Sequence, residues 1–167
     1  MREYTQKELN HLISCPKIID ELPKNEMIMV KGSLCNDMRL RSIDEKHNFY
    51  VFMRKNLELQ MNFSVGLIYK PGDHPEEIPL LRCNSCHGFI KDCISENPHF
   101  NTHIHYINAE DLNSGIRKPN RKEITTDYTT FEGAVVCFLT KVNIQNVEAS
   151  NYLVSLKQNE LFGTGGF

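Results

Sequence analysis

The sequence predicts an α+β fold: a twisted antiparallel β-sheet of about five to six strands with an N-terminal helix and a C-terminal helix packed on it. Three features lead to this prediction: a helix-start signal near the N-terminus, apolar residues at every second position through the middle of the chain, and apolar residues at helical spacing near its end. Short connections between neighbouring strands favour antiparallel pairing. The 167 residues are expected to form one domain, 1–167.

The N-terminal helix is predicted to begin at Thr5-Gln6-Lys7-Glu8, which has the spacing of a capping box. In this motif the Thr5 hydroxyl accepts a hydrogen bond from the Glu8 amide, while the Glu8 carboxylate reaches back to the Thr5 amide. The apolar stripe of the helix consists of Leu9, Leu12 and Ile13. Pro16 is expected to end the helix. Residues 1–24 are therefore assigned to an N-terminal helical segment.

Alternation of apolar and polar residues predicts the strands. Five short strands are expected over residues 27–30, 38–41, 49–54, 78–83 and 100–107. The clearest alternation runs over 57–70 and ends at the turn pair Pro71-Gly72, which predicts one long strand that can bend at Gly66.

The C-terminal helix is predicted to begin at a Thr129 or Thr130 cap. Its wide apolar face consists of Phe131, Ala134, Val135, Phe138, Leu139 and Val142. This face is expected to pack on the sheet. Residues 145–167 are predicted to form a C-terminal tail.

The composition is typical of a globular protein, with 40% hydrophobic and 24% charged residues. No apolar stretch approaches the roughly 18 residues that a membrane span requires, and the N-terminus lacks the apolar core of a secretory signal. We therefore expect a cytoplasmic protein with no membrane partner and six reduced cysteines. The formal net charge of −2 argues against a surface built for duplex DNA, but it is compatible with a local basic groove.

Strand residues in the middle of the chain are candidates for contacts with RNA. Arg39, Arg41 and Arg54 could bind the phosphate backbone of RNA, and Tyr106 could stack on an unpaired base. The alternative is that the arginines lie on solvated strand faces and that Tyr106 makes core or cross-strand contacts. Both interpretations stay open at this point.

The densest group of chemically active side chains lies between residues 80 and 106. His103 and His105 are two residues apart on a predicted strand, so both imidazoles point to one face, with roughly 7 Å between their Cα atoms. One ring can accept a proton while the other donates one, and Arg82 can stabilise developing negative charge. This arrangement suits a metal-independent ribonuclease that activates a ribose 2′-hydroxyl. The alternative is a pair of structural histidines.

A zinc site is a competing interpretation of the same region. Cys83 and Cys86 have C-x-x-C spacing, and Cys93 and His99 follow as further ligands for a tetrahedral site. The alternative is that Cys83 is a small buried strand residue and Cys86 a loop residue. No other cofactor is predicted.

Several short motifs follow one another between residues 57 and 144. They are Gly66-Leu67-Ile68-Tyr69, Leu80-Leu81-Arg82, His87-Gly88, Asn97-Pro98-His99-Phe100, His103-Ile104-His105-Tyr106, Cys137 and Asn143-Ile144. Their order resembles a small uncharacterised bacterial family of phages and mobile elements, and more remotely the TumE-like toxins of toxin–antitoxin systems. The resemblance implies Arg82, His87, His103 and His105 as the shared polar group. Cys83 and Cys86 depart from the pattern, which makes zinc binding an addition of this chain. Its net acidity suits a protein that binds another protein or a ribonucleoprotein.

The sequence thus predicts a phage-type or mobile-element protein that acts on RNA as a metal-independent endoribonuclease, in a toxin or anti-defence (anti-CRISPR) role. His103 and His105 would be the acid–base pair, Arg82 the phosphate stabiliser and His87 a supporting donor. The expected partner is RNA or a ribonucleoprotein, with an antitoxin or a defence nuclease as protein partner. Two alternatives stay open: a non-enzymatic inhibitor of a defence nuclease with structural histidines, and a small zinc-stabilised binding module.

Overall fold

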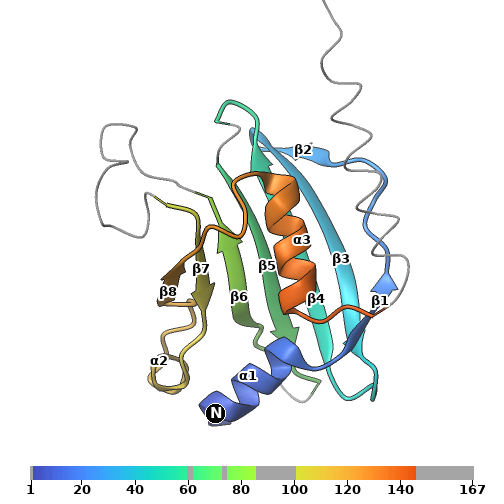
Figure 1. Cartoon of the computed structure of the whole chain (residues 1–167). Helices are drawn as coiled ribbons and strands as arrows, with labels where there is room; N and C mark the ends of the chain where they lie inside the picture. The colour runs from blue at the N-terminus through green and yellow to red at the C-terminus, as the bar shows by residue number, and fades with distance from the viewer. Residues whose placement is uncertain (1, 60–61, 73–74, 86–100, 146–167) are drawn as a thin grey trace, which may run out of the picture.

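The fold is built on one antiparallel sheet, which Figure 1 shows face-on. The computed structural model describes residues 2–59, 62–72, 75–85 and 101–145. The described helices are α1 (Gln6–Ser14), α2 (Ala109–Asn113) and α3 (Phe131–Lys141). The described strands are β1 (Lys17–Glu21), β2 (Ile28–Val30), β3 (Ser33–Ser42), β4 (Asn48–Asn56), β5 (Phe63–Lys70), β6 (Ile78–Asn84), β7 (His103–Tyr106) and β8 (Arg121–Ile124).

These eight strands of the described chain follow the order β1, β3, β4, β5, β6, β7 and β8, with β2 also paired to β3. Every pairing between them is antiparallel. The predicted α+β class is confirmed, and the sheet has more strands than predicted. The additional strands are β1 and β8, which are short, contain several charged residues and therefore show little apolar alternation.

The first helix begins where the capping box predicts. Thr5 Oγ1 accepts from the Glu8 amide at 3.2 Å, and the Glu8 carboxylate accepts from the Thr5 amide at 2.7 Å. The segment 1–24 is not helical throughout, however, because α1 ends at Ser14 and the chain enters β1 directly after Pro16. The proline removes a backbone donor, and the extended chain beyond it pairs with β3 instead.

The second predicted helix is α3, and it lies over the middle of the sheet (Figure 1). Thr130 is its cap, since Thr130 Oγ1 accepts from the Gly133 amide at 3.1 Å. The side chains of its predicted apolar face are buried against the strands. We call the sheet face under α3 the helix face and the opposite one the open face. No helix in the described part of the chain is long and apolar enough to cross a membrane. The predicted tail lies outside the described residues from position 146 on.

The long strand predicted over 57–70 is shorter in the structure, because β5 begins only at Phe63. Asn56 Oδ1 accepts from the amides of Glu58 and Leu59, both at 2.9 Å, and so holds the preceding segment in a turn. Such a side-chain bond offers the backbone an alternative to the strand ladder. Leu57 and Leu59, which the alternation assigned to a buried face, are 42% and 58% exposed.

A buried lysine joins the carboxyl ends of α1 and α3. Lys17 Nζ donates to the carbonyl oxygens of Ile13 and Cys15 at 2.8 Å and of Val142 at 3.1 Å, and it lies 4.7 Å from the centroid of the Phe49 ring. Carbonyl groups at helix ends carry partial negative charge, so one ammonium stabilises both ends. Burial lowers the pKa of Lys17 from 10.5 to about 8.

Candidate nucleic-acid interface

The structure brings Arg82 next to the histidine pair. Across β6 and β7, Arg82 is paired with His105 and Asn84 with His103. Directly opposed residues of an antiparallel pair point to the same face, with their Cα atoms about 5 Å apart. Arg82 and both histidines therefore share the open face, as the predicted site requires.

Backbone carbonyls determine the tautomers of the two histidines. His103 Nδ1 lies 2.7 Å from the carbonyl oxygen of Asn101, and His105 Nδ1 lies 2.8 Å from that of Pro119. A carbonyl only accepts, so Nδ1 carries the proton in each neutral ring and Nε2 is the basic nitrogen. The ring centroids are 4.7 Å apart.

Burial limits what these rings can do chemically. His103 is completely buried, and the Nε2 atoms of His103 and His105 are both buried. A general acid or base has to come within hydrogen-bond reach of the substrate. The geometry therefore favours a structural role, in which the rings attach residues 101 and 119 to β7.

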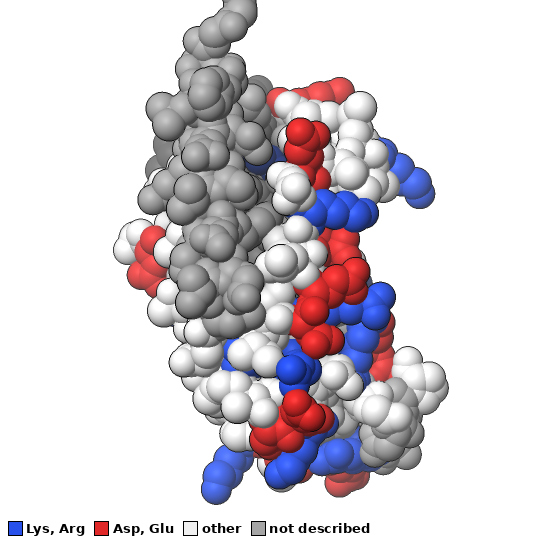
Figure 2. Space-filling view, turned by 90° about the vertical axis from the view of Figure 1, so that its right-hand side faces the viewer, with Lys and Arg blue, Asp and Glu red and all other residues white. Residues whose placement is uncertain are grey.

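Arg39 and Arg41 also lie on the open face, but nearby carboxylates neutralise them. Arg39 Nε lies 2.9 Å from Glu21 Oε2, and Arg41 Nε lies 3.1 Å from Asp20 Oδ1. Arg41 also forms an ion pair with Glu45. Figure 2 views the edge of the sheet on the β1–β3 side, where basic and acidic side chains are interspersed. These two predicted RNA contacts are thus occupied by intramolecular ion pairs.

Arg54 and Arg82 differ from the other arginines of the chain. Each of the other five forms an ion pair, whereas no carboxylate of the described residues lies within ion-pair distance of Arg54 or Arg82. Asp37 is on the same face, opposite Phe52 on β4, and it forms no ion pair with either arginine. The two guanidinium groups therefore carry positive charge that the described part of the chain does not neutralise.

Both arginines line one polar cavity of about 220 Å³, which we call the Arg54–Arg82 cavity. Its lining residues are Ser33, Arg54, Asn56, Asn62, Phe63, Ser64 and Arg82. Arg82 Nε donates to Ser64 Oγ at 2.7 Å, and Ser64 in turn donates to Asn84 Oδ1 at 3.0 Å. Burial, and then the nearby Arg54 charge, lower the pKa of Arg82, although an arginine remains charged at neutral pH. A bound anion would favour the charged form of Arg82 and so offset both the burial and the repulsion by Arg54.

Aromatic rings lie beside these cations on the open face. The Phe52 ring packs over Gly66, where an added Cβ would lie 2.4 Å from Phe52 Cε1. The centroid of the Phe52 ring is 5.8 Å from the Arg82 guanidinium. Tyr50 is two residues earlier on β4, with Lys70 Nζ 5.1 Å from its ring centroid. Both rings are half-buried. The glycine is required because only a residue without Cβ lets the Phe52 ring lie this close to β5.

Tyr106 and Cys83 belong to the helix face, because Tyr106 follows His105 in β7 and Cys83 is paired with Ile104. Tyr106 is half-buried beneath the Arg121 guanidinium, which lies 5.0 Å from its ring centroid. Cys83 is fully buried. Tyr106 is therefore on the wrong face to stack on a base bound beside Arg82, and Cys83 cannot share a metal ion with the histidine pair.

The remaining predicted site residues, Cys86, His87, Cys93 and His99, lie outside the described residues. Within the described ranges, no group of three or more His, Cys, Asp and Glu side chains could hold a metal ion. The zinc hypothesis stays a prediction.

A ring-lined cavity at the other end of the sheet was not predicted. The centroids of His11 and His47 are 6.4 Å apart, and His47 Nδ1 lies 3.3 Å from the Tyr69 hydroxyl. The cavity has a volume of about 340 Å³, and its lining residues are Arg2, Tyr4, Lys7, Glu8, His11, Leu12, His47 and Tyr69. The residues come from α1 and the segment before it, from the turn before β4 and from β5, which are far apart in the sequence, so local spacing carries no signal for the cavity.

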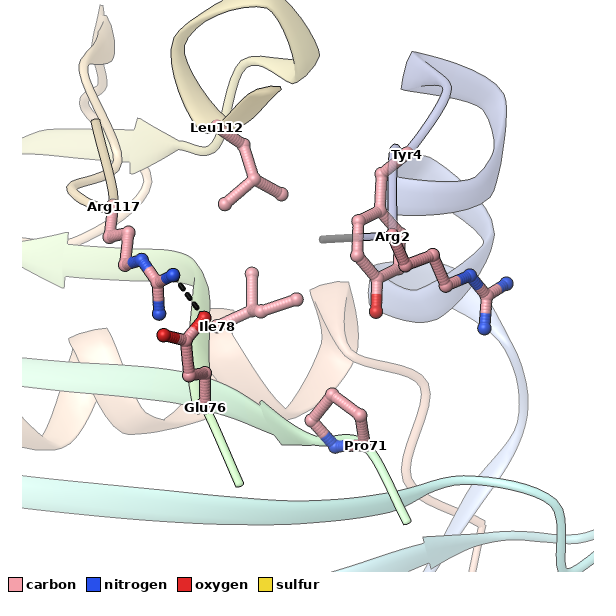
Figure 3. Close-up of a pocket in the computed structure, with 7 residues that line it drawn as sticks. All are labelled: Arg2, Tyr4, Pro71, Glu76, Ile78, Leu112 and Arg117. Carbon is pink, nitrogen blue, oxygen red and sulfur yellow. Dashed lines mark hydrogen bonds and ion pairs between the residues drawn. The ribbon is translucent and has the colours of Figure 1, made fainter. Parts of the chain in front are cut away.

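A smaller cavity borders Tyr4, and Figure 3 shows it between the Glu76–Arg117 ion pair and Tyr4, with Arg2 extending away from that pair. Its volume is about 30 Å³. This is enough for one or two water molecules and too small for a ligand.

Comparison with protein-family models, curated proteins and solved structures finds no match for the chain. What defines the site is therefore its own geometry: a sheet face on which two arginines, without a carboxylate partner in the described part of the chain, line a polar cavity beside aromatic rings.

Proposed function

We propose that the protein binds single-stranded RNA on the open face, with a phosphate group in the Arg54–Arg82 cavity. The observation that carries the proposal is the pair of arginines that share this cavity without an ion-pair partner among the described residues. Guanidinium groups bind phosphate oxygens through charged, often bidentate hydrogen bonds. An anion between two like charges also removes their mutual repulsion.

The aromatic residues support binding of unpaired bases. Tyr50 and Phe52 are on the same face as the cavity, and Phe52 contacts the Arg82 guanidinium. Base–aromatic stacking is worth about 1–3 kcal/mol per base and tolerates different sequences. Sheet modules that recognise single-stranded RNA combine such rings with basic groups. With a net charge of −2, the protein would rely on this local site and not on overall attraction.

Binding without hydrolysis is the function that the geometry supports best. The predicted acid–base pair has both Nε2 atoms buried, and His103 is fully enclosed. His87, the predicted supporting donor, lies outside the described residues. The endoribonuclease hypothesis stays a prediction, and an experiment can distinguish it from binding alone.

The binding test uses fluorescence anisotropy with a labelled RNA of about ten nucleotides. Arg54→Ala and Arg82→Ala are each expected to weaken binding at least roughly tenfold, because each removes a charged hydrogen-bond donor. Arg39→Ala is the matched control, since Arg39 is exposed and already paired with Glu21. Equal affinities for all four proteins would refute the proposed site.

The cleavage test incubates the same RNA with EDTA and either wild type or the His103→Ala/His105→Ala double variant. We expect intact RNA with both proteins. Cleavage by the wild type but not by the double variant would support the endoribonuclease hypothesis, with the histidines in their predicted roles.

A second candidate function is docking on a protein, the non-enzymatic alternative. The observation that favours it is the apolar strand β2, in which Ile28, Met29 and Val30 are 46%, 70% and 43% exposed. Exposed apolar groups that cluster in this way are typical of protein contacts. The test compares inhibition of a purified RNA-guided nuclease by wild type and Met29→Asp. Inhibition by the wild type only would support docking, and absence of inhibition by either protein would refute it.

A further inference from the structure

The positive charge of the Arg54–Arg82 cavity exceeds what a phosphate inside an RNA chain supplies. The cavity contains two guanidinium groups and no carboxylate among its lining residues. An internal phosphodiester carries one negative charge, whereas a phosphate monoester carries about 1.5 to 2 negative charges at neutral pH. Charge complementarity therefore favours the monoester.

The hydrogen-bond donors of the cavity lead to the same conclusion. Arg82 donates to Ser64 through Nε only, and its two terminal Nη groups have no hydrogen-bond partner among the described residues. The Asn56 side-chain oxygen accepts from two backbone amides, so its NH₂ group is the part that can serve a ligand. Together with the Arg54 guanidinium, these donors outnumber the two non-bridging oxygens of a diester. A monoester offers three terminal oxygens.

The position of the cavity also suits the end of a strand. It lies where β3 and β5 begin and β4 and β6 end, at one end of the open face. Phe52 is next to it on β4, two residues before Arg54, and contacts Arg82. A terminal phosphate in the cavity would place the adjoining nucleotide beside this ring.

We propose that the Arg54–Arg82 cavity recognises a phosphate monoester at the end of an RNA strand, and not a phosphodiester within it. This inference rests on the proposed RNA binding. It identifies the ligand as a 5′- or 3′-phosphorylated RNA end.

The experiment compares three RNAs of identical sequence and about eight nucleotides: one with a 5′-phosphate, one with a 3′-phosphate and one with hydroxyl groups at both ends. An internal fluorophore and anisotropy give the affinities of the full chain at about pH 7.5. We expect one phosphorylated RNA to bind at least roughly tenfold more tightly than the hydroxyl-ended RNA. That advantage should shrink at about pH 5.5, where the monoester loses its second charge.

Two variants locate the effect. Arg54→Gln and Arg82→Gln are both expected to remove the advantage of the phosphorylated end, while Arg39→Gln keeps it. Because Arg82 donates a hydrogen bond to the buried Ser64, circular dichroism melting checks that variant. Arg54, which is also exposed, provides an independent test. Equal binding of all three RNAs by wild type would overturn end recognition and leave RNA binding intact. Absence of binding to any RNA would overturn both.

Discussion

Replacement of Lys17 by methionine should change how the stability of the protein depends on pH. Lys17 is fully buried, and its ammonium donates to three backbone carbonyls at the ends of α1 and α3. Burial lowers its pKa from 10.5 to about 8 in the folded protein. Methionine keeps most of the aliphatic chain and removes the charge.

The magnitude and direction follow from proton linkage. Between about pH 8 and 10.5 the unfolded chain keeps the proton on Lys17 while the folded protein releases it. Stability rises with pH wherever the unfolded state binds more protons. The difference in pKa corresponds to about 3 kcal/mol, of which most should appear between about pH 7 and pH 10. Below about pH 7 both states are protonated and this contribution is constant.

Urea unfolding followed by circular dichroism provides the measurement, at about pH 7, 8, 9 and 10. The free energy of unfolding of the wild type relative to Lys17→Met should increase by about 2–3 kcal/mol over this range. Subtraction of the variant removes contributions of cysteines and tyrosines that titrate in the same window. Lys24→Met is the control, since residue 24 is exposed and its loss should leave the pH dependence unchanged. Parallel curves for wild type and Lys17→Met would refute the reasoning.

Three further predictions concern the open face and its support. Gly66→Ala should cost about 1–3 kcal/mol of stability in urea unfolding, because the new Cβ would displace the Phe52 ring; unchanged stability would show that the ring moves without cost. Tyr128→Phe should cost about 1–3 kcal/mol, since its buried hydroxyl lies 3.0 Å and 2.8 Å from the carbonyl oxygens of Asn84 and His103; a neutral effect would mean that these carbonyls do not need the donor. The logarithm of RNA affinity should fall with the logarithm of salt concentration with a slope of about −1 to −1.5, and Arg54→Ala should roughly halve it. A slope steeper than about −4 would indicate a much larger basic surface.

Local patterns in the sequence were sufficient for α1, α3 and most of the strands, whereas the short helix α2 was not predicted. The capping box at Thr5 and Glu8 determines the start of α1 through atoms three residues apart. Apolar spacing predicts the buried side of α3. Successive residues of β7 point to opposite faces of the sheet, so His103 and His105 lie on one face and Tyr106 on the other. The position of the tyrosine could therefore have been predicted without the structure.

Only the tertiary structure decided which arginines are available to a ligand. Arg39 and Arg41 are neutralised because β1, a strand without clear alternation, brings Asp20 and Glu21 against β3. Arg54 and Arg82 are on strands separated by β5, and their meeting in one cavity depends on the order and register of three strands. Short-range spacing determines local conformation because the interacting atoms are neighbours in the chain. Charge neutralisation and cavity formation depend instead on side chains that only the folded sheet places together.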